Sequence, residues 1–164
     1  AALASMFRRR WARGRRQRWA FIKTEDAEKW QDLSELSCAA LTRGMCVDWQ
    51  EFNACAGELP DLKDHDAILI SGSRYNVTDA DKHPWMEPLF GLLRAAADKS
   101  CSVRMVGVCF GCQAIAHALG GSVRCADDDP SFKYGSVPLD FVGDAFDHDF
   151  LRRAAATSGF NINS

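Results

Sequence analysis

The stretch VRMVGVCFGCQAIAHALGG, residues 103–121, constrains the fold of this chain more than any other. An apolar run of strand length, residues 103–108, leads directly into Cys109, and a segment of helical character follows. Gly107 and Gly111 stand two residues on either side of this cysteine. A sharp strand-to-helix turn brings those two positions together, so both must be small. The spacing therefore predicts a strained turn that presents the Cys109 thiol at the start of a helix.

Two other interpretations of the same loop remain open. Cys109 and Cys112 form a Cys-x-x-Cys pair, which at a helix N-terminus is typical of thiol redox proteins, because the helix dipole lowers the thiol pKa. That interpretation leaves the two glycines unexplained. A zinc site is less well supported, since one Cys-x-x-Cys supplies two ligands and no second pair follows at the usual spacing.

Strand and helix patterns alternate along the rest of the chain. Apolar runs and period-two patterns predict strands, and helical spacing predicts helices between them. Strands are expected at residues 19–23, 45–52, 67–71, 103–108, 122–126 and 136–142, and helices at 24–44, 83–100, 110–120 and 144–156. In the first helix Thr24 is expected as the N-cap, with Glu25 and Asp26 in the first turn, and Pro84 is expected in the first turn of the second.

This alternation predicts an α/β fold, a mostly parallel sheet with helices on both faces. The expected organisation is a basic, disordered extension over residues 1–18, a domain over 19–156 and an unstructured tail over 157–164. Chemistry in such sheets sits at the carboxyl ends of strands. Two loops qualify, SGSRYNVTD at 71–79 and CFGCQ at 109–113.

Charge and cysteine usage narrow the class of protein. Residues 1–19 hold seven arginines and no acid, leaving 13 basic against 22 acidic residues elsewhere. An acidic body argues against a nucleic-acid partner, and no apolar run reaches the roughly 18 residues of a membrane span. The basic start is typical of an organelle transit peptide, of a tail attracted to RNA or membranes, or of a disordered extension. Seven scattered cysteines fit the cytosol better than a secreted disulfide framework.

At this point the chain resembles a known family. GVCFGCQAIAHALGG resembles the nucleophile elbow of class I glutamine amidotransferases, G-x-C-x-G-x-Q, and DHDAILISGSRYNVTD resembles the strand and glycine turn of their oxyanion hole. The resemblance covers about residues 19–142 and is strongest to the plant-type gamma-glutamyl peptidase branch, whose turn has Gly-Ser-x. It implies a flavodoxin-like fold, no cofactor and no metal. It also implies these roles: Cys109 as nucleophile, Gly107 and Gly111 shaping the elbow, backbone N–H groups of Phe110 and of the Gly72-Ser73 turn as oxyanion hole, and Gln113 as site support.

The implied activity is attack of Cys109 on a gamma-glutamyl amide or peptide bond, giving a thioester and a free amine. The expected substrate is a small gamma-glutamyl compound, namely glutamine, a glutathione conjugate or a gamma-glutamyl peptide; whether a synthase partner exists stays open. The family often has His at the position of Cys112. It completes its triad with a downstream His-x-Glu that this chain lacks.

The four histidines do not replace that missing pair. His117 lies about 12 Å from Cys109 along the same helix, at 1.5 Å per residue, and His148 sits in a charged turn; His65 and His83 do not match the motif. We therefore expect a C-terminally truncated domain, either a fragment or a misjoined gene product, without its general base. Two alternative functions follow: a catalytically inactive module that binds gamma-glutamyl ligands or a partner, and a Cys-x-x-Cys redox protein.

Overall fold

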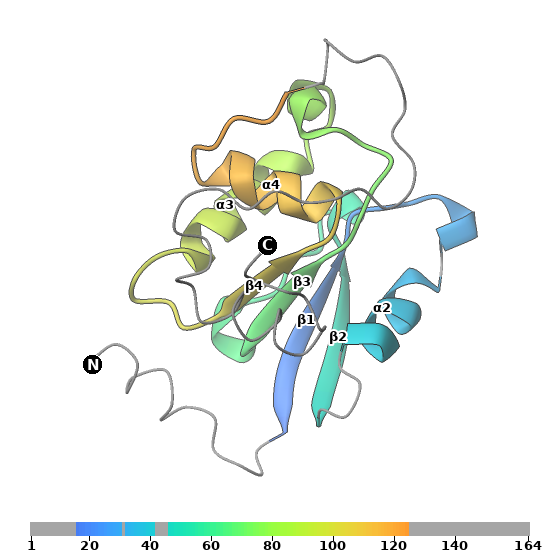
Figure 1. Ribbon diagram of the computed structural model, residues 1–164, viewed down its shortest axis with the longest axis vertical. Helices are drawn as coiled ribbons and strands as arrows, with labels where there is room; N and C mark the ends of the chain where they lie inside the picture. Colours follow the sequence, from blue (N-terminus) through green and yellow to red (C-terminus); the bar gives the residue numbers. More distant parts are fainter. Residues whose placement is uncertain (1–15, 31, 42–45, 125–164) are drawn as a thin grey trace, which may run out of the picture. The chain divides into compact units, whose positions relative to one another are not determined.

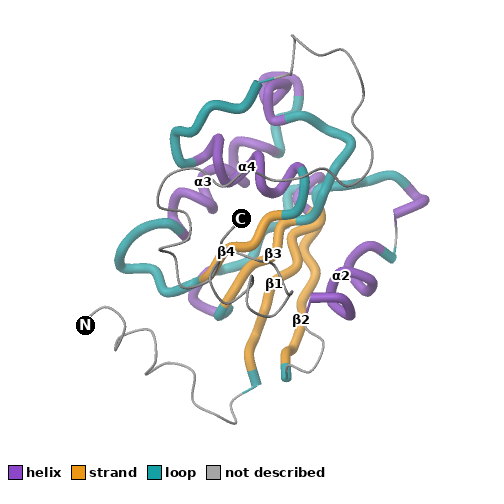
Figure 2. The backbone as a smooth tube through the Cα atoms, viewed as in Figure 1, coloured by secondary structure: helices purple, strands orange, loops and turns teal. Residues whose placement is uncertain are grey.

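Four parallel strands form the centre of the molecule. The computed structural model describes residues 16–30, 32–41 and 46–124 (Figure 1). The sheet has the order β2-β1-β3-β4, with every pairing parallel. The strands are β1 (Gln17–Lys23), β2 (Val47–Asn53), β3 (Ala67–Ile70) and β4 (Arg104–Gly107). This order confirms the predicted parallel α/β architecture, and all four expected strands within the described part of the chain are present (Figure 2).

The first strand begins earlier than the sequence indicates. Gln17 and Arg18, which we assigned to the basic extension, pair with Val47 and Asp48 of β2. The Arg18 backbone N–H also donates to the Asp66 carboxylate at 3.0 Å. The ladder therefore extends two residues beyond the apolar run, because backbone hydrogen bonds do not require apolar side chains.

Two helices cover one face of the sheet. Helix α3 spans Met86–Ala96 and helix α4 spans Phe110–Ala118. Their buried side chains pack against the alternate residues of β1 and β3 that point to this face, in one cluster that includes Ala20, Ile22, Ile68, Ile70, Leu89, Leu93 and Ala114. All four residues of β3 are buried, as expected for a strand covered on both sides. Gly120, with φ +85°, follows the end of α4 where the sequence predicted it.

The predicted helix over 24–44 is wrong in its first half. Only a short 3₁₀ turn at Glu28–Trp30 and helix α2 at Leu33–Leu41 form, with α2 lying beside β2 and away from α3 and α4 (Figure 1). Thr24 and Glu25 are buried and bond to the loop after β3 instead of capping a helix. Those long-range hydrogen bonds outweigh the local helical preference. Pro84 likewise precedes α3 instead of lying in its first turn.

Several predictions fall on residues that the structure does not describe. These are the extension over 1–15, the strand at 136–142, the helix at 144–156, the charged turn at His148 and the tail at 157–164. Cys125 also lies outside the described residues. Residues 122–124, the start of another expected strand, are irregular. Across the described residues, no helix has the length and apolar character needed to cross a membrane.

Candidate active site

Cys109 occupies a strained turn between β4 and α4. Its backbone has φ 52° and ψ −110°, and it is the single non-glycine residue with positive φ in the described part of the chain. Holding a side-chain-bearing residue in that region costs roughly 1–3 kcal/mol. The side chain is exposed at the N-terminus of α4. The structure thus contains the sharp strand-to-helix turn that the glycine spacing predicted.

Two close backbone approaches explain the flanking glycines. A Cβ at Gly107 would lie 2.4 Å from the carbonyl carbon of Gly111 and 2.5 Å from the Cys112 nitrogen. A Cβ at Gly111 would lie 2.4 Å from the carbonyl oxygen of Ile70. These distances are shorter than real Cβ contacts. A side chain at Gly107 would therefore push β4 away from the start of α4, and one at Gly111 would push the elbow away from β3.

The turn after β3 lies directly against the elbow. A Cβ at Gly72 would be 3.4 Å from the Cβ of Cys109. The Val108 N–H donates to the Ile70 carbonyl at 3.0 Å, and the Gly111 N–H donates to the Ser71 carbonyl at 3.1 Å. Two loops separated in sequence are therefore joined at the thiol, as expected where two neighbouring parallel strands end.

Three backbone N–H groups at this junction have no acceptor within the described part of the chain. The Gly111 N–H bonds to Ser71 and Val108 carbonyls, and the two amides after it bond to the Cys109 carbonyl. No such bond occupies the N–H of Phe110, the first residue of α4, or those of Gly72 and Ser73. Helix N-termini leave such donors unsatisfied, and donors of this kind can stabilise an anion.

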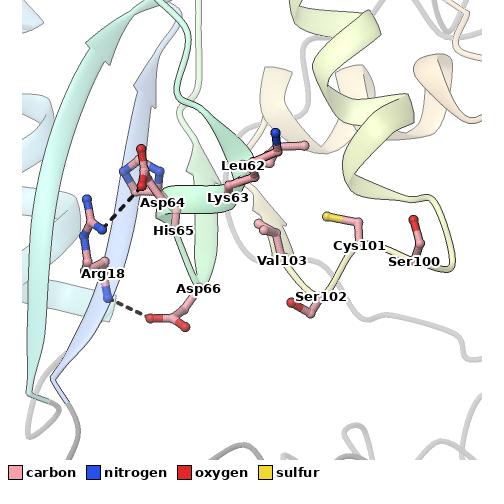
Figure 3. A pocket seen from close by; sticks show the side chains of 10 residues that line it. All are labelled: Arg18, Leu62, Lys63, Asp64, His65, Asp66, Ser100, Cys101, Ser102 and Val103. Carbon is pink, nitrogen blue, oxygen red and sulfur yellow. Dashed lines mark hydrogen bonds and ion pairs between the residues drawn. The ribbon is translucent and has the colours of Figure 1, made fainter.

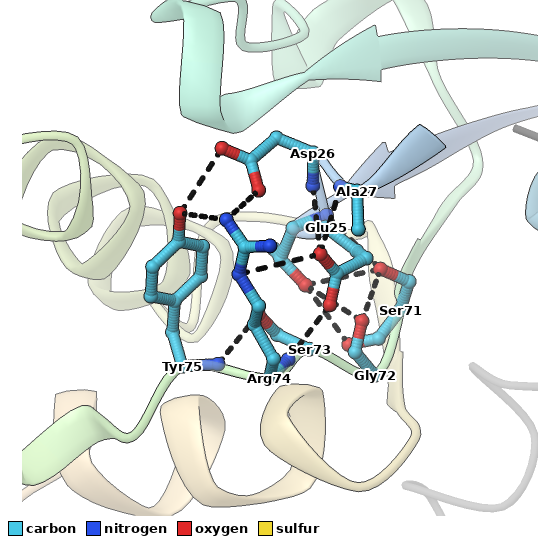
Figure 4. A network of polar contacts seen from close by, with 9 residues as sticks. Glu25, Asp26, Ala27, Ser71, Gly72, Ser73, Arg74 and Tyr75 are labelled. Carbon is cyan, nitrogen blue, oxygen red and sulfur yellow. Dashed lines mark hydrogen bonds and ion pairs between the residues drawn. The ribbon is translucent and has the colours of Figure 1, made fainter. Parts of the chain in front are cut away.

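A buried polar network fixes the Gly72-Ser73 turn (Figure 4). The Thr24 N–H donates to the Ser71 hydroxyl at 3.0 Å, and the Thr24 hydroxyl donates to the Ser71 carbonyl at 3.1 Å. The Glu25 side chain, 3% exposed, accepts from the Arg74 N–H at 2.8 Å. Its other oxygen accepts from the next two amides of its own loop at 3.0 and 2.9 Å.

Sequence reasoning missed this network entirely. The sequence predicts Thr24 as a helix N-cap and Glu25 as an acid of the first turn, because both precede an apolar periodic stretch. The one signal that could have found them is their position immediately after β1, at the point where the strand order reverses between β1 and β3. Ligand sites in open parallel sheets lie at that point.

An exposed layer surrounds the buried carboxylate. The Arg74 guanidinium contacts the Asp26 carboxylate at 2.8 Å and donates to the Tyr75 hydroxyl at 3.0 Å. That hydroxyl donates to the second Asp26 oxygen, also at 3.0 Å. The positive charge of Arg74 is thus already matched by carboxylates of the loop after β1.

No histidine of the described residues bonds to Cys109. His65 precedes β3 and bonds through its ring to the Asp61 carbonyl at 2.9 Å, and His117 stacks on Phe90 with ring centroids 4.8 Å apart. The His83 ring packs edge-on against the Tyr75 ring, with centroids 4.5 Å apart. His117 is exposed and contacts the Phe90 ring on the outer part of α4, and it does not bond to Cys109. The described residues contain no group of three or more His, Cys, Asp or Glu side chains that could hold a metal ion.

The thiols differ in their environment. Cys109 and Cys112 are both exposed, whereas Cys38 and Cys55 are partly buried. Burial raises the pKa of Cys38 to about 11, with the Glu51 carboxylate adding to the rise. Burial also raises the pKa of Cys55 to about 11, with Asp26 and Glu25 as further causes. These two thiols are therefore almost wholly protonated at neutral pH.

One cavity of considerable size lies at the other end of the sheet from this junction. It measures about 600 Å³ and is lined by residues that precede β3 and β4, among them His65, Asp66 and Val103 (Figure 3). It therefore opens at the amino ends of the strands, whereas catalysis in such sheets occurs at the carboxyl ends. Two smaller cavities adjoin the candidate site. One of about 140 Å³ includes Gln113, and one of about 380 Å³ includes Gly72 and Ser73.

Comparison with known proteins places these features in a family. Residues 34–148, more than half of the chain, match the family described as Glutamine amidotransferase class-I. The "Glutamine amidotransferase-like protein chry6" of Gibberella zeae is 28% identical over 88 residues, which cover 54% of this chain and 37% of that protein. "Gamma-glutamyl peptidase 4" of Arabidopsis thaliana is 33% identical over 95 residues, covering 56% of this chain and 36% of that protein.

One solved structure aligns with part of the chain. A glutamine amidotransferase from Thermotoga maritima aligns with a TM-score of 0.48 and 18% identity, covering 65% of this chain and 44% of that one. The matched region spans little more than a third of the length of the two curated relatives.

Proposed function

The chain belongs to the glutamine amidotransferase class-I family, and on that premise we propose that its domain acts on gamma-glutamyl amide or peptide bonds through the Cys109 thiolate. The observation that carries this proposal is the strained backbone of Cys109 directly against the Gly72 turn. Strain of this kind persists only where the surrounding structure enforces it, and it is typical of nucleophiles on tight turns.

The proposed reaction begins with attack of the Cys109 sulfur on the gamma-carbonyl carbon. A carbon–sulfur bond forms and the carbonyl electron pair moves to oxygen. The N–H groups of Phe110 and of Gly72 or Ser73 would stabilise that oxyanion; removing one such donor typically costs about 2.7–4 kcal/mol of transition-state stabilisation. Collapse breaks the carbon–nitrogen bond, and the amine leaves with the proton that the Cys109 thiol has given up. Water then hydrolyses the gamma-glutamyl thioester, which releases the gamma-carboxylate and restores the thiol.

The name of one relative supports the proposed substrate class. A relative named gamma-glutamyl peptidase supports a small gamma-glutamyl peptide, with glutamine and glutathione conjugates as further substrates of the same chemistry. Gln113, inside the first turn of α4, lines the cavity of about 140 Å³ next to the elbow and fits a supporting role there. We further propose a cytosolic location, which is supported by cysteines that form no disulfide among the described residues.

One observation favours a second function. No described histidine contacts Cys109, and thiol activation in this kind of chemistry needs an adjacent base. A catalytically inactive module that binds gamma-glutamyl ligands without turnover would retain the same turn and cavities. Cys109 and Cys112 are both exposed and lie three residues apart at the start of the same helix. A thiol redox protein is therefore the third candidate function.

Trapping of the acyl-enzyme separates these functions. The protein is incubated with a gamma-glutamyl anilide, and intact-mass spectrometry follows the gain of one glutamyl group. We expect the adduct on Cys109, retained in Cys112→Ser and lost in Cys109→Ser. Ligand binding without an adduct would support the inactive module. A reversible loss of two hydrogens that requires both cysteines, with no glutamyl binding, would support the redox protein.

A further inference from the structure

We propose that the cavity beside the Gly72-Ser73 turn is a carboxylate-binding subsite in which the Lys29 ammonium is the partner of a substrate carboxylate. The inference rests on the proposed function and adds a binding residue from the loop after β1. The cavity measures about 380 Å³, and its walls come from two loops: Glu25, Lys29, Trp30, Gly72, Ser73 and Arg74.

The position of the cavity connects it to the reacting atoms. Gly72 and Ser73 form part of its wall, and the same Gly72 lies against Cys109. A substrate whose carbonyl oxygen meets the free N–H groups of this turn therefore has one of its ends at the mouth of the cavity. A substrate group that enters the cavity would then belong to the same molecule as the carbonyl that the thiol attacks.

Three charged side chains line the cavity, and they differ in whether a partner of opposite charge already contacts them. The Glu25 carboxylate is occupied by three backbone N–H groups, and the Arg74 guanidinium contacts Asp26 at 2.8 Å. Lys29, in contrast, forms no ion pair within the described part of the chain. As far as the described residues go, the lining thus offers an anion a positive charge that no carboxylate pairs with.

An aromatic wall stands next to that charge. The Lys29 Nζ lies 5.6 Å from the centroid of the Trp30 ring, and Trp30 is 46% exposed. A large exposed aromatic side chain beside an ammonium suits a ligand with a short aliphatic stem and a terminal carboxylate, because the ring packs against the stem. Gamma-glutamyl peptides carry two such groups: the α-carboxylate of the glutamyl part and the C-terminal carboxylate of the leaving part.

The test measures binding of three ligands by calorimetry in the Cys109→Ala background, so that none is consumed. γ-Glutamylglycine has both carboxylates, γ-glutamylglycinamide lacks the leaving-group carboxylate, and γ-aminobutyrylglycine lacks the glutamyl one. Lys29→Met should raise the Kd of γ-glutamylglycine roughly fivefold or more. For the two ligands that carry a single carboxylate, Lys29→Met should raise the Kd of one to the same extent and leave the Kd of the other unchanged. The ligand that is affected identifies the carboxylate that Lys29 binds.

Two control variants accompany the measurement. Lys29→Arg keeps the charge and should restore binding, and Lys63→Met, in the cavity at the opposite end of the sheet, should change no Kd. If Lys29→Met weakens all three ligands equally, or none, the carboxylate subsite is wrong while the proposed function stands. If none of the three ligands binds even with Lys29 present, glutamyl recognition itself fails, and both the proposed function and the subsite are overturned.

Discussion

The Glu25 carboxylate accepts a hydrogen bond from the Arg74 backbone N–H at 2.8 Å, across 49 residues of sequence. This contact ties the loop after β1 to the turn after β3, whose Gly72 lies against Cys109. The carboxylate is 3% exposed, so it supports the turn in an environment from which water is nearly excluded. The geometry around the thiol therefore depends on a residue that contacts neither the thiol nor the elbow.

Removal of this carboxylate should destabilise the fold. Glu25→Ala leaves three backbone N–H groups without their acceptor, and each buried donor left unpaired costs about 1–3 kcal/mol. We expect a loss of at least about 2 kcal/mol in the free energy of unfolding, measured by urea denaturation. Glu87→Ala is the matched control, because its exposed pair with Arg94 is worth at most about 1 kcal/mol. Equal effects of the two substitutions would contradict a structural role for Glu25.

The close contact of the elbow with β3 predicts that Gly111→Ala is severely disruptive. The new Cβ would lie 2.4 Å from the Ile70 carbonyl oxygen, which is backbone and cannot rotate away. We expect a loss of about 3 kcal/mol or more in unfolding free energy. The matched control is Gly91→Ala in α3, where the nearest atom to the new Cβ is 4.0 Å away and the gain in helix propensity should stabilise by roughly 0.5–1 kcal/mol.

The cysteine thiols should differ in how fast they react with iodoacetamide and in how that rate changes with pH. At neutral pH, limiting iodoacetamide should label Cys109 before Cys38 and Cys55, because the pKa of each of the latter is raised to about 11. A raised pKa means that the reactive thiolate forms only as the pH rises, so labelling of these two should accelerate steeply towards pH 11. Peptide-resolved mass spectrometry reports each site. First labelling at Cys38 or Cys125 would remove the main chemical support for a nucleophile at Cys109.

Two truncations test where the basic segment ends and the sheet begins. Deleting residues 1–15 should leave the melting temperature unchanged, since this stretch has no periodic apolar pattern and its arginines repel one another. Deleting residues 1–18 should lower it by several degrees, because it also removes Gln17 and Arg18 from their pairing with β2 and with Asp66. Equal melting temperatures for the two deletions would mean that this end of β1 contributes nothing to stability.

The local features of this protein could be predicted from its sequence. Four strands, the end of α4 at Gly120 and the strained turn at Cys109 follow from periodicity and from the steric needs of residues close together in the chain. The need for glycine at positions 107 and 111 could be predicted, because a side chain at either position would clash with the backbone of the same turn or of the neighbouring strand.

Tertiary structure decided which distant loops meet. Thr24 and Glu25 are residue types that often begin a helix. They bond to the loop that contains the Gly72-Ser73 turn because β1 lies next to β3. The same is true of Lys29, which enters the candidate site because its loop lies beside that turn. Hydrogen-bond partners 47 and 49 residues apart leave no periodic trace in a sequence, since their pairing depends on strand order, and strand order is a property of the folded sheet.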